Sequence, residues 1–209
     1  MPNFIMEKTF EGPVAGVDEA GCGPWSGPVV AGAVIFDDYD AAAKELSMLD
    51  DSKKLTKLKR EKLFEQLHEM PGVHIGVGQC TREEIDSLNI RQAALLAMKR
   101  AVEDMSIAPA HVLADGTGIP DLACDVQPIV KGDALSLSIA AASVIAKVTR
   151  DKIMTRLAAK YPEYGWERNS GYGTAEHQKA INEYGITPHH RRSFAPIAKH
   201  IEGKLNEAF

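Results

Sequence analysis

Valine, isoleucine and small apolar residues run almost unbroken through two early stretches, 13–19 and 28–36, on either side of a loop rich in glycine and proline. Runs of this length bounded by turn residues are typical of strands, and the short loop predicts that they pair as a hairpin. Similar runs predict strands at 73–80, 111–116 and 126–132. Pro128 cannot donate to a neighbouring strand, so the last of these is expected at a sheet edge.

A different periodicity marks the helices. Between 81 and 105, apolar residues recur at spacings of three and four, with charged residues on the other side, which is typical of an amphipathic helix. The apolar positions are Ile90, Ala94, Leu95, Met98 and Val102. Further helices are predicted at 56–69, from Asp133 to about Lys160, at 174–184 and at 196–207. Strands interspersed with helices predict an α/β architecture, a mixed sheet covered by helices.

The bulk composition fits one ordinary globular domain: 209 residues, 44% hydrophobic and 25% charged. The longest weakly polar run, 134–148, carries serines and is too short to span a bilayer, and no leader-like segment opens the chain. Cys22, Cys80 and Cys124 form no CxxC pair, which disfavours both disulfides and a structural zinc site. We therefore expect a cytoplasmic protein with no membrane association.

Acidic residues stand beside glycine at the ends of three apolar runs. Asp18 and Glu19 precede Gly21, Asp115 precedes Gly116, and Asp133 follows Gly132. Neighbouring strand residues face opposite ways, so Asp18 and Glu19 could share one ion only if the chain bends at Ala20-Gly21. Taken singly, each site is typical of a turn, and Asp133 of a helix cap. Together, four carboxylates without histidine or cysteine favour Mg²⁺ or Mn²⁺.

The net charge of −5 does not indicate a polyanionic partner, but the local distribution of charge matters more than the total. Two stretches, 52–62 and 189–192, are strongly basic. Taken alone, the first is most typical of a solvated helix face.

In order and spacing, these motifs resemble the bacterial ribonuclease HII family from about Val14 to Pro196. The matching segments are GVDEAG (16–21), GPVV (27–30), DSKKLT (51–56), KRE (59–61), ADG (114–116), KGDALSLSIAAASVIAKVTRD (131–151), GYGTAEH (171–177) and HHRRSFAP (189–196). The resemblance implies one ribonuclease H-like catalytic domain over 1–209. Its mixed five-stranded sheet would be flanked by helices, with a small helical extension, about 165–209, that binds substrate.

The resemblance also implies the chemistry. Asp18, Glu19, Asp115 and Asp133 would be the catalytic, metal-binding acids, and two Mg²⁺ or Mn²⁺ ions would serve phosphodiester hydrolysis. The implied substrates are the RNA strand of an RNA–DNA hybrid and a ribonucleotide embedded in duplex DNA. The implied products carry 3′-hydroxyl and 5′-phosphate ends, and we expect a monomer.

Substrate contacts follow from the same match. Gly21, Cys22 and Gly23 would offer backbone groups to the ribose and its phosphate, and Tyr172 would pack on the sugar. Without the match, Tyr172 is equally typical of a half-buried aromatic. Basic and polar residues expected to contact substrate are Lys53, Lys54, Ser143, Lys147 and Arg150. His177, His190 and Arg191 match motif positions, and for the histidines a structural role is as typical as a catalytic one.

The loop departs from the family in one position, because Cys22 stands where a basic residue is common. Its backbone groups remain while the charge is lost, and no neighbouring residue is spaced to activate its thiol. Two rival functions stay open: a protein that binds hybrids without cutting, and a metal-dependent nuclease or transposase acting on all-DNA duplexes. The four acids argue against the first, and the second has no use for a ribose-reading Tyr172.

Overall fold

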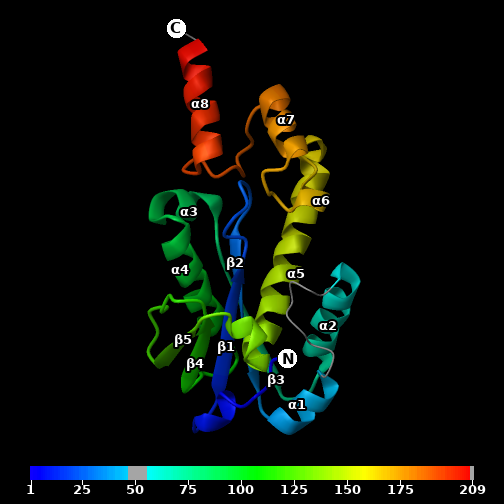
Figure 1. Ribbon diagram of the computed structural model, residues 1–209, viewed down its shortest axis with the longest axis vertical. Coiled ribbons are helices and arrows are strands. Elements are labelled where there is room, and N and C mark those ends of the chain that lie inside the picture. Colours follow the sequence, from blue (N-terminus) through cyan, green and yellow to red (C-terminus); the bar gives the residue numbers. More distant parts are fainter. Residues whose placement is uncertain (47–55, 208–209) are drawn as a thin grey trace.

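The computed structural model describes residues 1–46 and 56–207, with side chains as far as 204. Its centre is a five-stranded sheet in the order β3-β2-β1-β4-β5 (Figure 1). The strands are β1 (Val14–Ala20), β2 (Val29–Phe36), β3 (Val73–Cys80), β4 (His111–Asp115) and β5 (Asp125–Ile129). The pairs β1–β2 and β2–β3 are antiparallel, whereas β4 runs parallel to both β1 and β5. The predicted mixed α/β sheet, its hairpin and its Pro128 edge strand are confirmed.

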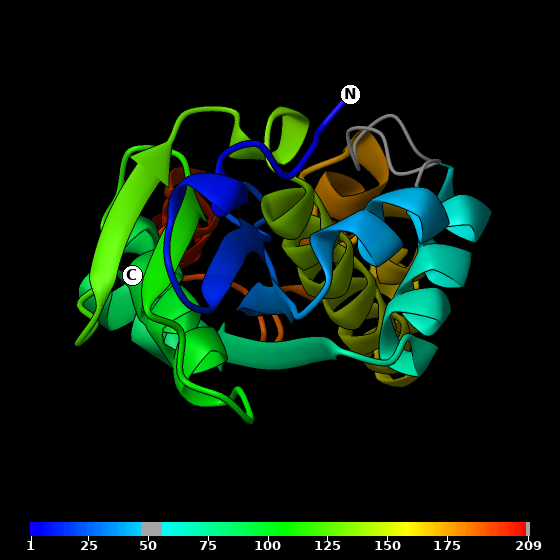
Figure 2. The ribbon, with the colours of Figure 1, turned by 90° about the horizontal axis from the view of Figure 1, so that it is seen from below.

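Helices cover both faces of this sheet, and each face has its own apolar core (Figures 1 and 2). On one face lie α3 (Arg82–Leu88) and α4 (Ile90–Glu103), packed on alanine and valine side chains of β1, β2 and β4. On the other lies the long α5 (Leu137–Lys160), joined by α1 (Tyr39–Glu45) and α2 (Lys57–Glu69). A Cβ on Gly16 would stand 2.2 Å from the backbone of Ser138 and Ile139, so glycine there lets α5 lie directly on β1.

Two predicted helices differ from the structure. The segment expected as one helix at 81–105 breaks at Asn89, whose φ of 71° ends α3 while its side chain caps α4. The helix expected from Asp133 begins at Leu137 instead, because Ser136 is the N-cap and accepts from the Ile139 N–H. Asp133 lies in the preceding 3₁₀ turn η2 (Gly132–Ala134), so it does not cap α5.

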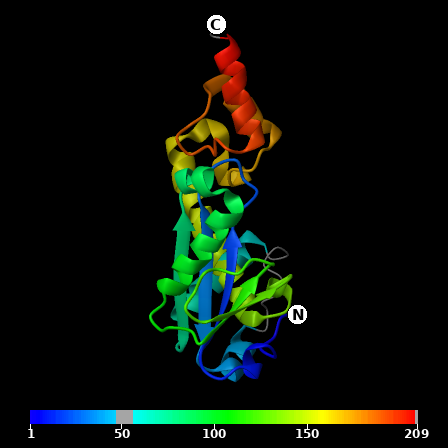
Figure 3. The same cartoon turned by 90° about the vertical axis from the view of Figure 1, so that its left-hand side faces the viewer.

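The C-terminal part of the chain gathers at the end of the sheet where β1 stops (Figure 3). It contains η3 (Pro162–Tyr164), α6 (Trp166–Asn169), α7 (Ala175–Tyr184) and α8 (Ala195–Glu207). A separate apolar cluster that includes Met154, Trp166, Ile181 and Ile197 fastens these elements to the second half of α5. The remaining short element is η1 (Glu7–Thr9). Among the described residues, none of the helices is both long and apolar enough to cross a membrane.

Candidate active site

The acidic residues of β1 and β4 meet because the two strands run side by side and end together. The parallel register pairs Val17 with Ala114, and Asp18 and Asp115 are the next residues on each strand. Strand β1 stays regularly paired with β2 through Ala20, so Asp18 and Glu19 leave opposite faces of the sheet. The predicted bend follows at Gly21, whose φ is 104°.

A pocket of about 280 Å³ opens at this point. It is lined by most of the residues predicted from the sequence: Asp18, Glu19, Gly21, Cys22, Gly23, Asp115, Ser143, Lys147 and Tyr172. Arg60 also lines it, and sequence reasoning had placed that residue only in a basic helix, although the KRE motif contains it. Lys53 and Lys54 lie outside the described residues.

Asp18 sits at the floor of the pocket, with 4% of its surface exposed. Burial first, and then the negative charges of Glu19 and Asp115, hold the pKa of its carboxyl well above the usual range. A side-chain hydrogen bond from Ser143 on α5 and the Glu19 N–H, at 2.7 Å, oppose that shift. Ser143, predicted to bind substrate, thus contacts Asp18 in this structure.

Glu19 and Cys22 contact each other across the mouth of the loop. The thiol of Cys22 donates to Oε1 of Glu19 at 3.4 Å. Burial and the Glu19 charge raise the pKa of this thiol to about 12. Cys22 is therefore a neutral thiol at physiological pH, which excludes it as an activated nucleophile.

Asp115 is tied to the turn that carries Asp133. The Gly132 N–H donates to Oδ1 of Asp115 at 2.7 Å. Asp133, the next residue, is 4% exposed and does not line the pocket. Within the described residues, no three His, Cys, Asp or Glu side chains are arranged so that they could hold a metal ion. The structure thus gathers three of the four acids in one pocket and places the fourth beside it.

Two buried arginines hold the glycine-rich loop from behind. Arg191 is 0% exposed and donates to the carbonyl oxygens of Gly21 and Cys22, at 2.6 and 3.1 Å, and to those of two further loop residues, Gly27 and Pro28. In a trans peptide the N–H points away from the C=O. The N–H groups of Cys22 and Gly23 are therefore turned away from Arg191, on the side where these residues line the pocket.

The second arginine corrects a prediction. Arg150 was expected to hold a phosphate, but its side chain is buried and donates to the carbonyl oxygens of Ser26, Pro28 and Ser170 at 2.9 to 3.1 Å. That expectation is wrong, because all three donor nitrogens already bind the protein's own backbone. Lys147 does line the pocket, and its ammonium pairs with Asp151 at 2.7 Å.

Tyr172 lies half-exposed at the rim, and its ring edge comes close enough to Gly23 that a Cβ there would stand 3.2 Å from it. The flanking glycines were predicted to let a duplex approach. A Cβ on Gly171 would instead meet the Ser26 carbonyl at 2.7 Å, and one on Gly173 the Trp25 ring at 2.0 Å. These glycines serve packing within the protein, which fixes the tyrosine against the loop.

A buried histidine pair lies behind Tyr172. The Thr187 N–H donates to Nδ1 of His190 at 2.9 Å, so the proton of neutral His190 is on Nε2, 3.0 Å from Nε2 of His177. His177 also accepts from the Trp166 indole N–H, and its own Nδ1 proton is left to donate to the Tyr172 carbonyl at 2.9 Å. Each ring nitrogen thus has a defined partner, and both histidines support the rim of the pocket from inside.

This pair should make the protein less stable in acid. Burial, then the neighbouring His177, lowers the pKa of His190 to about 3, whereas an unfolded histidine has a pKa near 6.5. Below about pH 6.5 the unfolded chain binds a proton that the native state excludes. We expect stability to fall as pH drops from there towards 3, by up to about 1.4 kcal/mol per pH unit for this residue. Urea unfolding from pH 7.5 to 5 should show a shallower decline for His190→Asn; parallel curves would contradict the expectation.

Comparison with known proteins places these features in a family. The family model described as Ribonuclease HII matches residues 15–197. The chain is 52% identical over 202 residues to the ribonuclease HII of Paramagnetospirillum magneticum, covering 96% of this chain and 99% of that one. It is also 52% identical over 197 residues to the ribonuclease HII of Rhodospirillum rubrum, covering 94% and 90%.

A solved structure gives the same answer for the fold. The crystal structure of the ribonuclease H2 from Pyrococcus horikoshii OT3 superposes with a TM-score of 0.76 at 30% identity, covering 91% of this chain and 98% of that one. The ribonuclease H-like fold expected from the sequence is thereby confirmed. With a family model that spans most of the chain and relatives of nearly full length, this protein belongs to the ribonuclease HII family of endoribonucleases.

Proposed function

We propose that this protein uses divalent ions to cut the RNA strand of RNA–DNA hybrids and, in duplex DNA, the strand at an embedded ribonucleotide. The observation that carries the proposal is the composition of one pocket. The carboxylates of Asp18, Glu19 and Asp115 share it with the main chain of 21–23 and the ring of Tyr172. Groups suited to phosphodiester hydrolysis therefore lie beside groups suited to recognising a sugar.

The donor set fits Mg²⁺ or Mn²⁺, because it consists of carboxylate oxygens and because Asp18 carries unrelieved repulsion from its two acidic neighbours. Asp18, Glu19 and Asp115, with Asp133 from the adjoining turn, would hold the ions. Two such ions would supply a nucleophilic water and neutralise the leaving oxygen, giving 3′-hydroxyl and 5′-phosphate ends. Ser143 and the Gly132 N–H each fix one carboxylate, while Glu19 would exchange its contact with Cys22 for an ion.

Ribose recognition would come from the loop and the tyrosine. The N–H groups of Cys22 and Gly23 can donate to the 2′-hydroxyl or the adjacent phosphate, and every residue type offers the same N–H. Cysteine at position 22 is compatible with that role. Tyr172 presents an exposed ring at the rim, against which a sugar can pack.

The remaining parts of the proposal concern the setting. The helices after residue 165 flank the pocket end of the sheet and would contact the duplex beyond the cut (Figure 3). Three free cysteines, one of them buried, suit a reducing cytoplasm. We expect the protein to act there as a monomer.

The test offers three labelled duplexes: an RNA–DNA hybrid, a DNA duplex with one ribonucleotide, and the same duplex without it. With Mg²⁺ or Mn²⁺ we expect the first two to be cut, and with a chelator none. Cutting of all three at similar rates would indicate a DNA nuclease. Binding of the first two without cutting in either metal would indicate a binding protein.

Tyr172→Ala should cut the single-ribonucleotide duplex at least about tenfold more slowly, since stacking on an aromatic ring is worth about 1–3 kcal/mol. Tyr172→Phe should be milder because the ring remains. Tyr184→Ala removes another exposed tyrosine outside the pocket and serves as the control. Initial rates on the ribonucleotide and all-DNA duplexes measure the effect. Unchanged rates for Tyr172→Ala would remove this residue from substrate recognition.

A further inference from the structure

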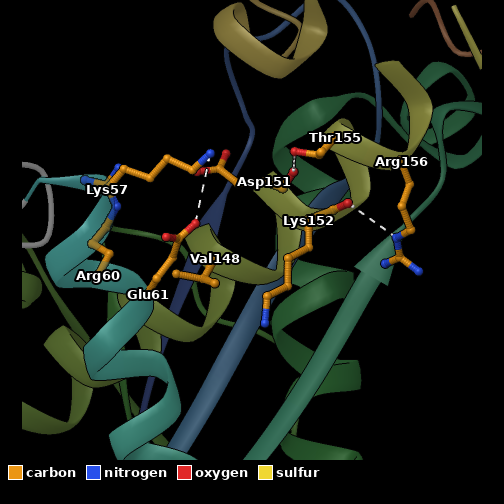
Figure 4. Close-up of a pocket in the computed structure, with 8 residues that line it drawn as sticks. All are labelled: Lys57, Arg60, Glu61, Val148, Asp151, Lys152, Thr155 and Arg156. Atoms are coloured by element: carbon orange, nitrogen blue, oxygen red, sulfur yellow. Dashed lines mark hydrogen bonds and ion pairs between the residues drawn. The ribbon is translucent and has the colours of Figure 1, made fainter. Parts of the chain in front are cut away.

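Beside the catalytic pocket, a second hollow of about 560 Å³ lies between α2 and α5 (Figure 4). We propose that this α2–α5 groove binds the phosphodiester backbone of the substrate duplex next to the segment being cut. The groove is defined by Lys57, Arg60 and Glu61 on α2 and by Asp151, Lys152 and Arg156 on α5. The inference rests on the proposed function only in taking nucleic acid as the ligand.

The groove carries excess positive charge in a protein whose net charge is −5. Four of its lining residues are cations and two are carboxylates. Glu61 is 4.0 Å from Lys57, and Asp151 is paired at 2.7 Å with Lys147, which belongs to the catalytic pocket. Both carboxylates are thus already matched. In the part of the chain that the structure describes, Lys152 and Arg156 form no ion pair with a carboxylate.

The positions of these two cations are set by local contacts. The Lys152 ammonium lies 3.9 Å from the centroid of the Phe64 ring on α2, a cation–π contact that holds its stem across the groove. Arg156 uses only its Nε, at 3.3 Å, to bind the Lys152 carbonyl one turn earlier. Its terminal nitrogens retain their donor capacity, and Figure 4 shows the guanidinium extending away from the helix.

The groove continues into the catalytic pocket. Arg60 lines both hollows, and the Lys147–Asp151 pair links them. Asp151 also accepts from the Ser170 hydroxyl at 3.2 Å, two residues before Tyr172. A strand whose sugar reaches Tyr172 would therefore have further phosphates within range of this basic surface.

The chemistry of the lining favours a polyanion over a small metabolite. The cations are distributed along two helices instead of converging on one point, and Val148 is the only apolar lining residue among those described. Such a surface suits successive phosphates and reads no bases, so its contribution should be independent of sequence and sensitive to salt.

The experiment measures binding of an all-DNA duplex without divalent ions, so that it does not depend on cleavage. The double variant Lys152→Gln/Arg156→Gln is compared with wild type over a salt series. The control, Lys44→Gln/Lys62→Gln, removes two exposed lysines of α1 and α2 that lie outside the groove. We expect the groove variant to bind about fivefold more weakly at low salt. Its plot of log affinity against log salt should also be flatter by about one to two phosphate contacts, at about 0.9 per contact.

The control should match wild type in both readouts. Equal affinity and slope for wild type and groove variant would overturn the inference, whatever the cleavage assay shows. Conversely, a wild-type protein that fails to cut any ribonucleotide duplex would defeat the proposed function, and the binding series would still decide the role of the groove. Weaker binding by groove and control variants alike would also contradict it, because a general charge effect would then suffice.

Discussion

Asp18→Asn and Asp115→Asn should each lower the rate of cleavage by about two to four orders of magnitude, the range for groups that act directly at a reacting centre. Both carboxylates line the pocket, and each is oriented by a hydrogen bond, from Ser143 and from the Gly132 N–H respectively. An amide has almost the same shape but offers one neutral oxygen to an ion. Steady-state rates on the single-ribonucleotide duplex with Mg²⁺ and with Mn²⁺ measure the loss.

The same variants should fold at least as well as wild type. Without an ion, Asp18 is held charged only against burial and two acidic neighbours, so its raised pKa means that stability is lost as pH rises towards neutrality. Asp18→Asn should therefore raise the melting temperature of the metal-free protein at pH 7. Asp121→Asn, at an exposed aspartate far from the pocket, is the matched control for both measurements. Near wild-type turnover by Asp18→Asn would show that the site has been assigned to the wrong residues.

Arg191→Met should have the second large effect, this time on stability. Burial lowers the pKa of Arg191 to about 9, so it remains a cation at neutral pH, and its guanidinium serves four carbonyl oxygens of the 21–28 loop. Methionine fills similar volume but leaves those oxygens without donors. We expect the free energy of unfolding to fall by about 3–5 kcal/mol, typical of breaking a buried charged network.

The folded fraction of Arg191→Met should also distinguish ribonucleotide from all-DNA duplex less well, because the loop N–H groups are no longer held towards the pocket. Arg191→Lys keeps the charge without the planar set of donors and should be intermediate. The neighbouring Arg192 is exposed, so Arg192→Met is the control. Urea unfolding and paired cleavage rates give both results. If Arg191→Met were as stable as Arg192→Met, the loop would not depend on this clamp.

The sheet could be predicted because its strands are locally explicit. Valine-rich runs with turn residues at their ends marked all five, and Pro128 marked an edge. The helix break at Asn89 was not visible, since the apolar periodicity continues across it and only the left-handed backbone interrupts the hydrogen bonds. Similarly, Asp133 and Ser136 are both good caps, and the choice depended on the turn at Lys131, where φ is 58°.

The site divided along the same line. Residue type and order were enough to identify the acids, the loop and Tyr172 as candidates, and the structure brings nearly all of them to one pocket. What the sequence could not distinguish was which basic residues face outward. Lys147 and Arg150 stand one helical turn apart on α5, yet one lines the pocket as an ion pair and the other is buried against three carbonyls. That difference depends on tertiary packing against the 21–28 loop.

The account's central claim is that one pocket joins metal-dependent hydrolysis to recognition of a ribose. The most direct test uses two DNA duplexes that differ by a single 2′-hydroxyl, incubated with wild-type protein and Mg²⁺ or Mn²⁺, with the cut position and end groups mapped. We predict a single cut at the ribonucleotide, with 3′-hydroxyl and 5′-phosphate ends, and no cut at the matching position of the all-DNA duplex. Equal cutting of the two duplexes, or no cutting of either, would contradict the claim.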